Sequence, residues 1–386
     1  MKKVRLGDIC TVVSGTTPKS HVDEYWNGDK VWITPAEINE DTLVVTDSVR
    51  HISESAVKDS SLKSFPKGTV ILSSRAPIGK MAIAGCEMYC NQGFKNLICS
   101  EKINNLYLLY FLRSRKNYLN SLGRGATFKE ISKGIVENIK VPLPSMDTQI
   151  QIGNRIRTIE KLIGLRKKQL FLLDDLIKSR FVEMFGDPLE NPYNFDVYLI
   201  KDLVIKSNNG ISRRGKSSGG NIVLRLVELQ DGFIDYAKPN RMLLTDSEKE
   251  RFILHDNDVL FARVNGNPDR VGKCAVFYEI GEPVYHNDHI IRFHFDETKV
   301  NSTYLVILLN SKYGGIKIRS KIKTSAGQYT VSQEGIKSIE ILLPPLKLQK
   351  QYDSIVHHID KSKLAVQKSL EELEKLKNSL MQQYFD

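Results

Sequence analysis

The chain has 386 residues, 41% of them hydrophobic and 26% charged, a composition typical of a soluble protein large enough for two domains and connecting helices. It has no apolar run of roughly 18 residues, an N-terminus that leads into polar sequence, and five cysteines without a CxxC pair. We therefore expect a cytoplasmic protein without a membrane span or a disulfide framework, and the net charge of +11 favours a polyanionic partner such as nucleic acid.

Residues 1–143 predict a first mixed α/β domain with several short strands. Its clearest signal is residues 67–83, where two β-rich runs flank an arginine and a proline-bearing turn. A helical signal at residues 36–39 is too short to define an element. The other predicted elements are a turn-rich loop at 14–19, a strand at 31–34, an apolar helix at 107–112, a polar turn at 123–128 and a strand at 139–143.

Residues 144–186 predict one long helix. Pro144 opens the segment and Gly186-Asp187-Pro188 ends it, with no proline between them. The spacing of one face of a coiled-coil-like helix, steps of four and three residues with one step of seven, separates Ile152, Ile156, Ile159, Ile163, Leu170, Leu173 and Ile177. A helix of about 40 residues is roughly 60 Å long.

Residues 187–343 repeat the first domain with changed details. The strand–turn–strand at 67–83 matches 257–276, the helix at 107–112 matches 304–309, and the strand at 139–143 matches 339–343. The loop at 14–19 matches 207–220, the polar turn at 123–128 matches 324–329, and we pair Asn91-Gln92-Gly93-Phe94 with His286-Asn287-Asp288-His289. The second domain is therefore expected to be a mixed α/β fold like the first.

Residues 344–386 repeat the long helix at a constant offset of 200. Eleven residues of the first copy recur in the second: Pro144, Gln149, Gln151, Ile159, Lys161, Lys168, Leu170, Leu173, Leu176, Ser179 and Phe185. Charged residues interrupt the apolar stripes at different rows, Arg166 and Arg180 in one and Lys363 and Lys377 in the other.

An exposed apolar stripe of this length needs a partner, so we expect the two helices to pack on each other as a spacer between the domains. The alternative is two core helices of one large domain. The predicted helix–helix contacts are Ile152, Ile156, Ile159, Leu170, Leu173, Val356, Ile359, Val366, Leu370 and Leu373.

Basic residues gather in the two predicted domains, around 113–124, 213–216 and 312–323. Arginines on strands beside flexible turns suit contacts to phosphates or base edges, although a solvated basic surface would look the same for any single cluster. The candidate DNA contacts are Arg75, Lys80, Asn91, Gln92, Arg124 and Lys129 in the first domain, and Arg213, Arg214, Lys216, Arg263, Asn265, Lys273, Lys321, Lys323, Gln328 and Tyr329 in the second.

In order and in duplication, these motifs resemble the specificity subunit of type I DNA restriction-modification systems. The resemblance covers nearly the whole chain. Lys347 and Thr148, which precede the two glutamines Gln349 and Gln149, depart from the family pattern and affect only details of helix capping. The motifs are Ser14-Gly15-Thr16-Thr17-Pro18, Ile78-Gly79-Lys80, Asn91-Gln92-Gly93-Phe94, Val141-Pro142-Leu143-Pro144 with Gln149-Ile150, Phe185-Gly186-Asp187-Pro188 with Asn191-Pro192, and Leu343-Pro344-Pro345-Leu346 with Gln349.

The resemblance implies two similar α/β target recognition domains, at 1–143 and 187–343, separated by two long antiparallel, coiled-coil-like helices at 144–186 and 344–386. Each domain would grip one half of a bipartite, asymmetric double-stranded DNA sequence. The helices would set the spacing and dock two modification subunits, which bind S-adenosylmethionine and methylate adenine. Restriction subunits would supply ATP hydrolysis and Mg-dependent cleavage, so we expect no catalytic residue, cofactor or metal in this chain.

Enzyme motifs in the chain are incomplete. Asn191-Pro192-Tyr193 lacks the second proline of a methyltransferase motif, and the segment from Gly266 to Lys273 is one residue too long for a P-loop. Pro268-Asp269 followed by Glu297-Thr298-Lys299 matches a loose nuclease pattern, and His286, His289 and His294 lack a fourth zinc ligand. The alternatives left open are a helical scaffold whose basic domains bind RNA or acidic proteins, and an autonomous nuclease.

Overall fold

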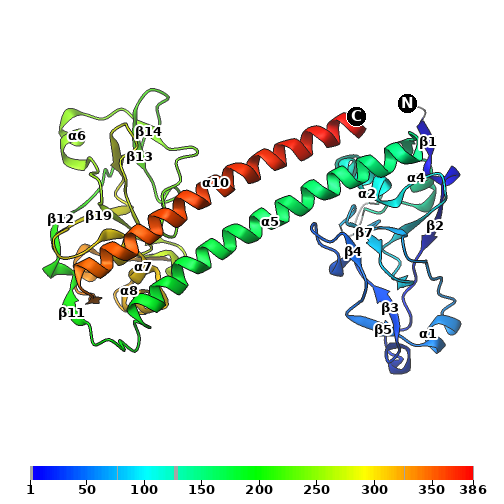
Figure 1. Cartoon of the computed structure of the whole chain (residues 1–386), viewed down its shortest axis with the longest axis horizontal. Helices are drawn as coiled ribbons and strands as arrows, with labels where there is room; N and C mark the ends of the chain where they lie inside the picture. The colour runs from blue at the N-terminus through cyan, green and yellow to red at the C-terminus, as the bar shows by residue number, and fades with distance from the viewer. Residues whose placement is uncertain (1–2, 76, 126–128, 326, 386) are drawn as a thin grey trace. The chain divides into compact units, whose positions relative to one another are not determined.

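A computed structural model describes residues 3–75, 77–125, 129–325 and 327–385. The chain divides into two compact units, Met1–Lys168 with Gln367–Asp386, and Gln169–Val366 (Figure 1). Each unit holds one mixed α/β module and a part of both long helices, so the predicted fold class is confirmed. The four domain boundaries stay a prediction. The parts of the predicted turns at 76, 126–128 and 326 lie outside the described residues.

The first module is organised on a five-stranded sheet of order β2-β9-β6-β7-β4, with a second sheet of order β5-β3-β8 and the pair β1–β10. The strands are β1 (Lys3–Arg5), β2 (Cys10–Ser14), β3 (Lys30–Ile33), β4 (Val44–Val45), β5 (Arg50–Ile52), β6 (Val70–Leu72), β7 (Met81–Ala84), β8 (Tyr89–Cys90), β9 (Lys95–Cys99) and β10 (Lys140–Pro142). The helices are η1 (Leu6–Asp8), η2 (Asp23–Trp26), η3 (Pro35–Glu37), α1 (Glu54–Asp59), α2 (Asn105–Ser114), α3 (Lys116–Leu122) and α4 (Lys133–Glu137). The short helical signal at 36–39 is thus a 3-10 turn, η3.

The second module has a four-stranded sheet of order β12-β19-β15-β17, two three-stranded sheets, β14-β13-β18 and β16-β21-β20, and the pair β11–β22. The strands are β11 (Asp196–Leu199), β12 (Val204–Asn209), β13 (Asn221–Leu224), β14 (Arg241–Met242), β15 (Val259–Ala262), β16 (Val264–Asn265), β17 (Cys274–Val276), β18 (Val284–His286), β19 (Ile290–Phe295), β20 (Lys323–Ser325), β21 (Gln328–Thr330) and β22 (Glu340–Leu343). The helices are η4 (Ile200–Asp202), α6 (Asp246–Phe252), η5 (Pro268–Arg270), α7 (Ser302–Asn310), α8 (Lys312–Arg319) and α9 (Gln333–Lys337).

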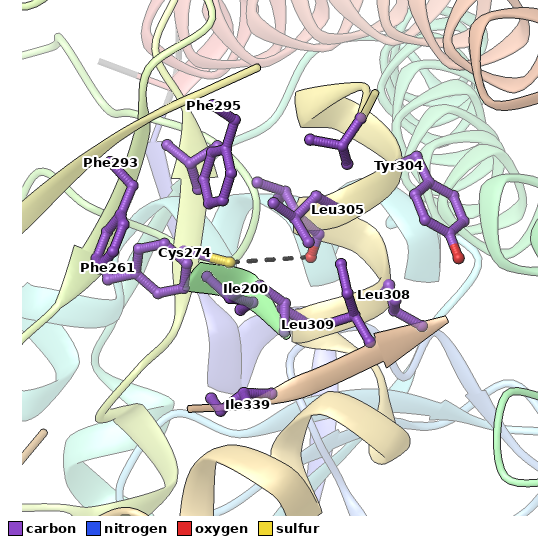
Figure 2. Packing of buried hydrophobic residues seen from close by; sticks show 14 of the residues in the cluster. Ile200, Phe261, Cys274, Phe293, Phe295, Tyr304, Leu305, Leu308, Leu309 and Ile339 are labelled. Carbon is purple, nitrogen blue, oxygen red and sulfur yellow. Dashed lines mark hydrogen bonds between the residues drawn. The ribbon is translucent and has the colours of Figure 1, made fainter. Parts of the chain in front are cut away.

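The core of the second module lies between its main sheet and α7. Figure 2 shows Phe261 and Phe293 on the sheet facing Leu305 and Leu309 of α7, with Cys274 between them. The thiol of Cys274 points to the Val306 carbonyl at 4.0 Å, and burial raises the pKa of the thiol. Cys274 is therefore an inert core residue, as expected for a free cysteine in apolar surroundings.

Both modules share a chain path that a glycine makes possible. A Cβ on Gly15 would stand 2.2 Å from the carbonyl oxygens of Cys90 and Asn91, and one on Gly210 would stand 2.1 Å from the carbonyl oxygen of His286. Only glycine permits so close an approach of two backbones. Gly15 and Gly210 therefore occupy equivalent places in the two modules.

A buried glutamine joins each long helix to the module that precedes it. Gln149, near the start of α5 (Met146–Phe185), accepts from the Asn104 N–H (2.9 Å) and donates to the carbonyls of Lys102 (3.1 Å) and Pro144 (3.0 Å). Its side chain is buried, and both polar atoms of the amide group, the oxygen and the nitrogen, form hydrogen bonds. The helix start is thus tied to the loop that caps α2.

Gln349 repeats this joint in the second unit, near the start of α10 (Leu346–Phe385). It accepts from the Asn301 N–H (2.8 Å) and donates to the carbonyls of Lys299 (3.4 Å) and Pro344 (2.7 Å). Asn301 caps α7 as Asn104 caps α2. The two glutamines at the constant offset are therefore structural equivalents with the same hydrogen bonds.

In the first unit the beginning of α5 lies beside the end of α10, antiparallel to it (Figure 1). Ile152, Ile156 and Ile159 are buried on α5, and Phe385 of α10 closes the core against Tyr107. One of the charged breaks in the stripes, Lys377, forms an ion pair with Glu160 of the other helix at 2.7 Å, and Lys167 forms a second ion pair between the helices with Glu374 at 3.9 Å. Leu370 is buried, while Leu373 is half-buried.

In the second unit the end of α5 lies beside the beginning of α10. The Tyr352 hydroxyl donates to the Ile177 carbonyl at 2.9 Å, and Lys363 forms an ion pair with Asp174 at 2.6 Å. Burial lowers the pKa of Lys363, but Asp174 and Asp360 outweigh it and raise the pKa. Of the predicted seam residues in this unit, those that are buried or half-buried are Leu170, Leu173, Val356, Ile359 and Val366.

Replacing Gln149 with leucine should destabilise the first unit by about 3 kcal/mol, because it leaves the Asn104 N–H and two carbonyls without partners in a buried place. The only tryptophans of the chain, Trp26 and Trp32, lie in this unit, so urea unfolding followed by tryptophan fluorescence reports on it. The matched control is the exposed Gln151→Leu on the same helix, which should change stability by less than about 0.5 kcal/mol. Equal effects of the two substitutions would contradict the joint.

Candidate nucleic-acid interface

A small sheet in the second module gathers four of the predicted DNA contacts. In β16-β21-β20, Asn265 is opposite Tyr329, which is opposite Thr324, and Gln328 is opposite Ser325. Lys323 begins β20, and Arg263 directly precedes β16. Lys323 and Gln328 are exposed, while Asn265 and Tyr329 are half-buried. We call this sheet, with Arg263, the second strip.

Two arginines meet beside the second strip around Asp288. The Arg214 guanidinium pairs with the Asp288 carboxylate at 2.8 Å and lies 3.0 Å from Nε2 of His289. Arg263 donates from Nη1 to the Asp288 carbonyl at 3.0 Å and from its backbone N–H to the His289 carbonyl at 2.8 Å. Asp288 thus holds one arginine by its side chain and the other by its backbone.

Other predicted contacts of the second module lie apart from the strip or have structural partners. Lys273 is 3.5 Å from Asp231, and Lys216 is exposed in the loop before β13. Lys321 is half-buried and precedes β20. The exposed Arg213 uses its whole fork, because Nε and Nη2 each reach an oxygen of Glu248 at 2.7 Å. Arg213 thereby supports the cap of α6, and its contact to DNA stays a prediction.

The first module has a smaller strip of isolated bridges. Glu130 pairs with Arg75 on one side and with Arg124 on the other, and the Arg124 N–H donates to the Glu130 carbonyl at 3.0 Å. Arg124 and Lys129 are exposed and Arg75 is half-buried. We call residues 75, 124, 129 and 130 the first strip.

Three further candidates of the first module lie near this strip but contact the protein itself. The Lys80 ammonium donates to the Pro35 carbonyl at 2.7 Å. Asn91 accepts from the Gly93 N–H at 2.9 Å, and a Cβ on Gly93 would lie 3.6 Å from Nε of Arg75. The exposed Gln92 accepts from the Thr17 hydroxyl. Asn91 therefore shapes the turn, whereas the Gln92 amide nitrogen has no hydrogen bond within the described residues, and a contact of Gln92 with DNA stays a prediction.

Matching hydrogen bonds correct our pairing of the two modules by one residue. The Ile131 N–H donates to the Ser74 backbone carbonyl at 3.0 Å in the first module, and the Val331 N–H donates to the Arg263 backbone carbonyl at 2.9 Å in the second. Ser74, and not Arg75, is therefore the equivalent of Arg263.

The same correction applies to the turn before the last strand of the main sheet. The Gly93 N–H donates to the Asn91 side chain, and the His289 N–H donates to the Asn287 side chain at 3.2 Å. Asn91 thus corresponds to Asn287, and the predicted match to His286 is wrong. The segments between the matched residues differ in length in the two modules, so an offset carried from one motif to the next misplaces it, and one residue of slip moves every side chain to the other face of a strand.

Sequence reasoning missed three residues in or beside the strips: Asp288, Glu130, and Lys95, whose ammonium lies 3.0 Å from the Glu130 carboxylate. Acidic side chains were not sought on a surface expected to meet DNA, and Lys95 lies in an apolar strand. The signal available for Asp288 was its place beside Asn287, the second copy of the Asn91 turn.

The histidines and the nuclease-like pattern have separate partners. Nδ1 of His286 faces the Phe252 carbonyl at 3.3 Å, and burial lowers the pKa of this histidine to about 4. His294 lies 2.9 Å from Asp258. Asp269 pairs with Arg319, whereas Lys299 pairs with Asp296 at 3.3 Å. Among the described residues, no three His, Cys, Asp or Glu side chains converge as a metal site requires.

Comparison with known proteins places the chain in a family. The family described as type I restriction modification DNA specificity domain matches residues 1–172 and 195–377, one match for each module. The chain therefore belongs to this family of DNA-recognition subunits. No helix in the described part of the chain has both the length and the apolar character that crossing a bilayer requires.

Individual relatives agree along the whole chain. It is 29% identical to the type I restriction enzyme MjaIX specificity subunit of Methanocaldococcus jannaschii, covering 99% of this chain and 91% of that one. It is 26% identical to the StySPI specificity subunit of Salmonella potsdam, covering 98% and 86%. The crystal structure of the type I restriction-modification S subunit from M. genitalium has the same fold, with a TM-score of 0.63, 13% identity, and 100% and 96% coverage.

The Arg213–Glu248 pair should make the second unit sensitive to acid. The hydrogen bond from Arg213, with that from the Thr245 N–H, lowers the pKa of Glu248 from 4.5 to about 2. A lowered pKa stabilises the fold above the ordinary value, and this stabilisation is lost as the pH falls from about 4.5 towards 2. In melting followed by circular dichroism, the melting temperature of Glu248→Gln should lie below that of the unaltered chain at pH 6, and the gap should narrow as the pH falls from about 4.5 towards 2. A gap that is independent of pH would contradict the pair.

Proposed function

We propose that each module reads one half of a bipartite, asymmetric DNA sequence. One observation carries this proposal: equivalent backbone positions in and beside the two strips hold different side chains. Ser74 stands where the second module has Arg263, and the turn after the shared asparagine is Gln92-Gly93 in one and Asp288-His289 in the other. Two like scaffolds with unlike reading side chains suit two unlike half-sites, because base edges are read by donor and acceptor patterns.

We further propose that the paired helices α5 and α10 fix the spacing of the half-sites and dock two modification subunits. Support comes from apolar side chains that the helix pair leaves exposed, Leu162 and Leu165 in the first unit and Phe171, Leu172 and Leu176 in the second. Four of them follow steps of three, seven and four residues along α5, a second stripe at coiled-coil spacing that a partner helix would cover.

In this proposal, catalysis belongs to the partners. Modification subunits would bring S-adenosylmethionine and methylate the DNA, and restriction subunits would bring ATP hydrolysis and Mg-dependent cleavage, in the cytoplasm. This chain would supply recognition and spacing alone.

Selection from random duplexes by the full chain, assembled with its modification subunits, tests the function. We expect enrichment of a split motif with a fixed gap. Absence of any enriched motif, together with equal or tighter binding of RNA, would favour the basic scaffold instead.

Arg263→Ala and Lys323→Ala should weaken DNA binding in different ways. Arg263 adjoins the reading turn, so its loss should cost about 10- to 100-fold on the intact site and nothing further once the second half-site is scrambled. The exposed Lys323 would neutralise a phosphate, so its loss should weaken all sequences and lower the slope of log K against log salt by about 0.9. Anisotropy titrations at several salt concentrations separate the two. Equal losses by Arg263→Ala on both duplexes would show a phosphate contact.

Leu172→Asp should impair assembly with the modification subunits, because it places a charge in the middle of the exposed stripe. We expect a loss of at least about tenfold in affinity by calorimetry, with unchanged unfolding of the chain alone. The matched control is Val49→Asp, which adds the same charge at a residue that is 84% exposed in a loop of the first module. Unchanged affinity of Leu172→Asp would remove this face from the docking surface.

A further inference from the structure

A buried lysine lies against the first strip. Lys95 opens β9 and is only 7% exposed. Its ammonium is 3.0 Å from the Glu130 carboxylate and 3.5 Å from the Ser74 hydroxyl. A lysine in such a place needs a charged partner, since an unpaired buried ammonium is costly. Lys95 therefore depends on Glu130 for its ion pair.

Glu130 has two other cations within reach across the strip. It is the bridge partner of both Arg75 and Arg124, and cross-strand partners point to the same face with their Cβ atoms about 5 Å apart. Even so, within the described chain the carboxylate pairs with Lys95 and neither arginine side chain has an ion pair or hydrogen bond. The ion pair with Lys95 thus engages the Glu130 carboxylate, which would otherwise attract the side chain of Arg75 or Arg124.

The second module shows that the acid and the base belong together. By the matched hydrogen bonds, Glu130 corresponds to Thr330 and Lys95 to Ile291, which is fully buried. The second strip has neither the carboxylate on its middle strand nor the cation beneath it. One module carries both members of the pair and the other carries neither.

We propose that Lys95 is a positioning residue for DNA recognition by the first module: it holds Glu130 and so keeps Arg75 and Arg124 free to bind DNA phosphates. The inference rests on the proposed reading of DNA by the strip. Without Lys95, the Glu130 carboxylate turns to a neighbouring arginine and one phosphate contact is lost. Without both Lys95 and Glu130, the arginines are free again.

The test uses the full chain assembled with its modification subunits and the duplex that it selects. Lys95→Met should weaken binding about tenfold and lower the slope of log K against log salt by about 0.9, the value of one phosphate contact. Adding Glu130→Gln to Lys95→Met should restore both quantities. A second rescue is Lys95→Ile with Glu130→Thr, which copies the second module and keeps the strand apolar.

Two controls separate positioning from charge and from folding. Lys30→Met removes one positive charge from ion pairs with Asp29 and Glu54 in the same unit, and should leave the slope unchanged. Tryptophan fluorescence in urea shows whether each variant keeps the first unit folded, and the double variants supply the answer where Lys95→Met alone is unstable.

Each outcome decides one question. If the unaltered complex selects no sequence, the proposed function falls and the role of Lys95 falls with it. If the complex selects a split motif but the slope is the same for Lys95→Met, or the double variants fail to restore it, only the positioning role is overturned. A lowered slope for Lys30→Met would also overturn it, because the effect would then be one of net charge.

Discussion

The buried amides of Gln149 and Gln349 are the constraint on which the rest of the fold depends. Each one hydrogen-bonds a long helix to the loop that caps the apolar helix of its module. Three bonds from one side chain fix the direction in which the helix leaves, because a tilt would leave donors and acceptors unsatisfied in a place that water does not reach. The direction in which each long helix leaves its module is therefore set by its hydrogen bonds to that module.

The other end of each helix completes a core. Phe385 packs on Tyr107 and Phe111 in the first unit, while Phe185 packs on Tyr304 and Tyr352 in the second. A module thus needs the start of one helix and the end of the other to be whole. Ion pairs at different rows, such as Glu160 with Lys377 and Asp174 with Lys363, make the two stripes complementary and not interchangeable. These charges favour one antiparallel register, since a slip would separate each of them from its partner.

The sequence allowed the helices and most elements to be predicted, because their signals are periodic and because the helical repeat keeps a constant offset. The strips were harder. Insertions change the offset between the modules, so that Arg75 seemed to match Arg263 and His286 seemed to match Asn91. Only backbone hydrogen bonds reveal that Ser74 and Asn287 are the true equivalents. Counting residues between motifs does not establish the register of a strand, and a register error of one residue assigns every side chain to the wrong face.

Counting positive charges also overstates the surface available to DNA. Arg213 forms an ion pair with Glu248, Lys80 donates a hydrogen bond to the Pro35 carbonyl, and Lys363 forms ion pairs with Asp174 and Asp360. Each of these cations therefore interacts with the protein itself. The first strip shows the opposite use of a pair. The buried Lys95 pairs with the Glu130 carboxylate, and in the part of the chain that the structure describes the side chains of Arg75 and Arg124 have no ion pair or hydrogen bond. The positive charge that a basic protein presents to a polyanion is the charge of those Lys and Arg side chains that are not already paired with its own carboxylates. Which side chains these are depends on the geometry around each carboxylate.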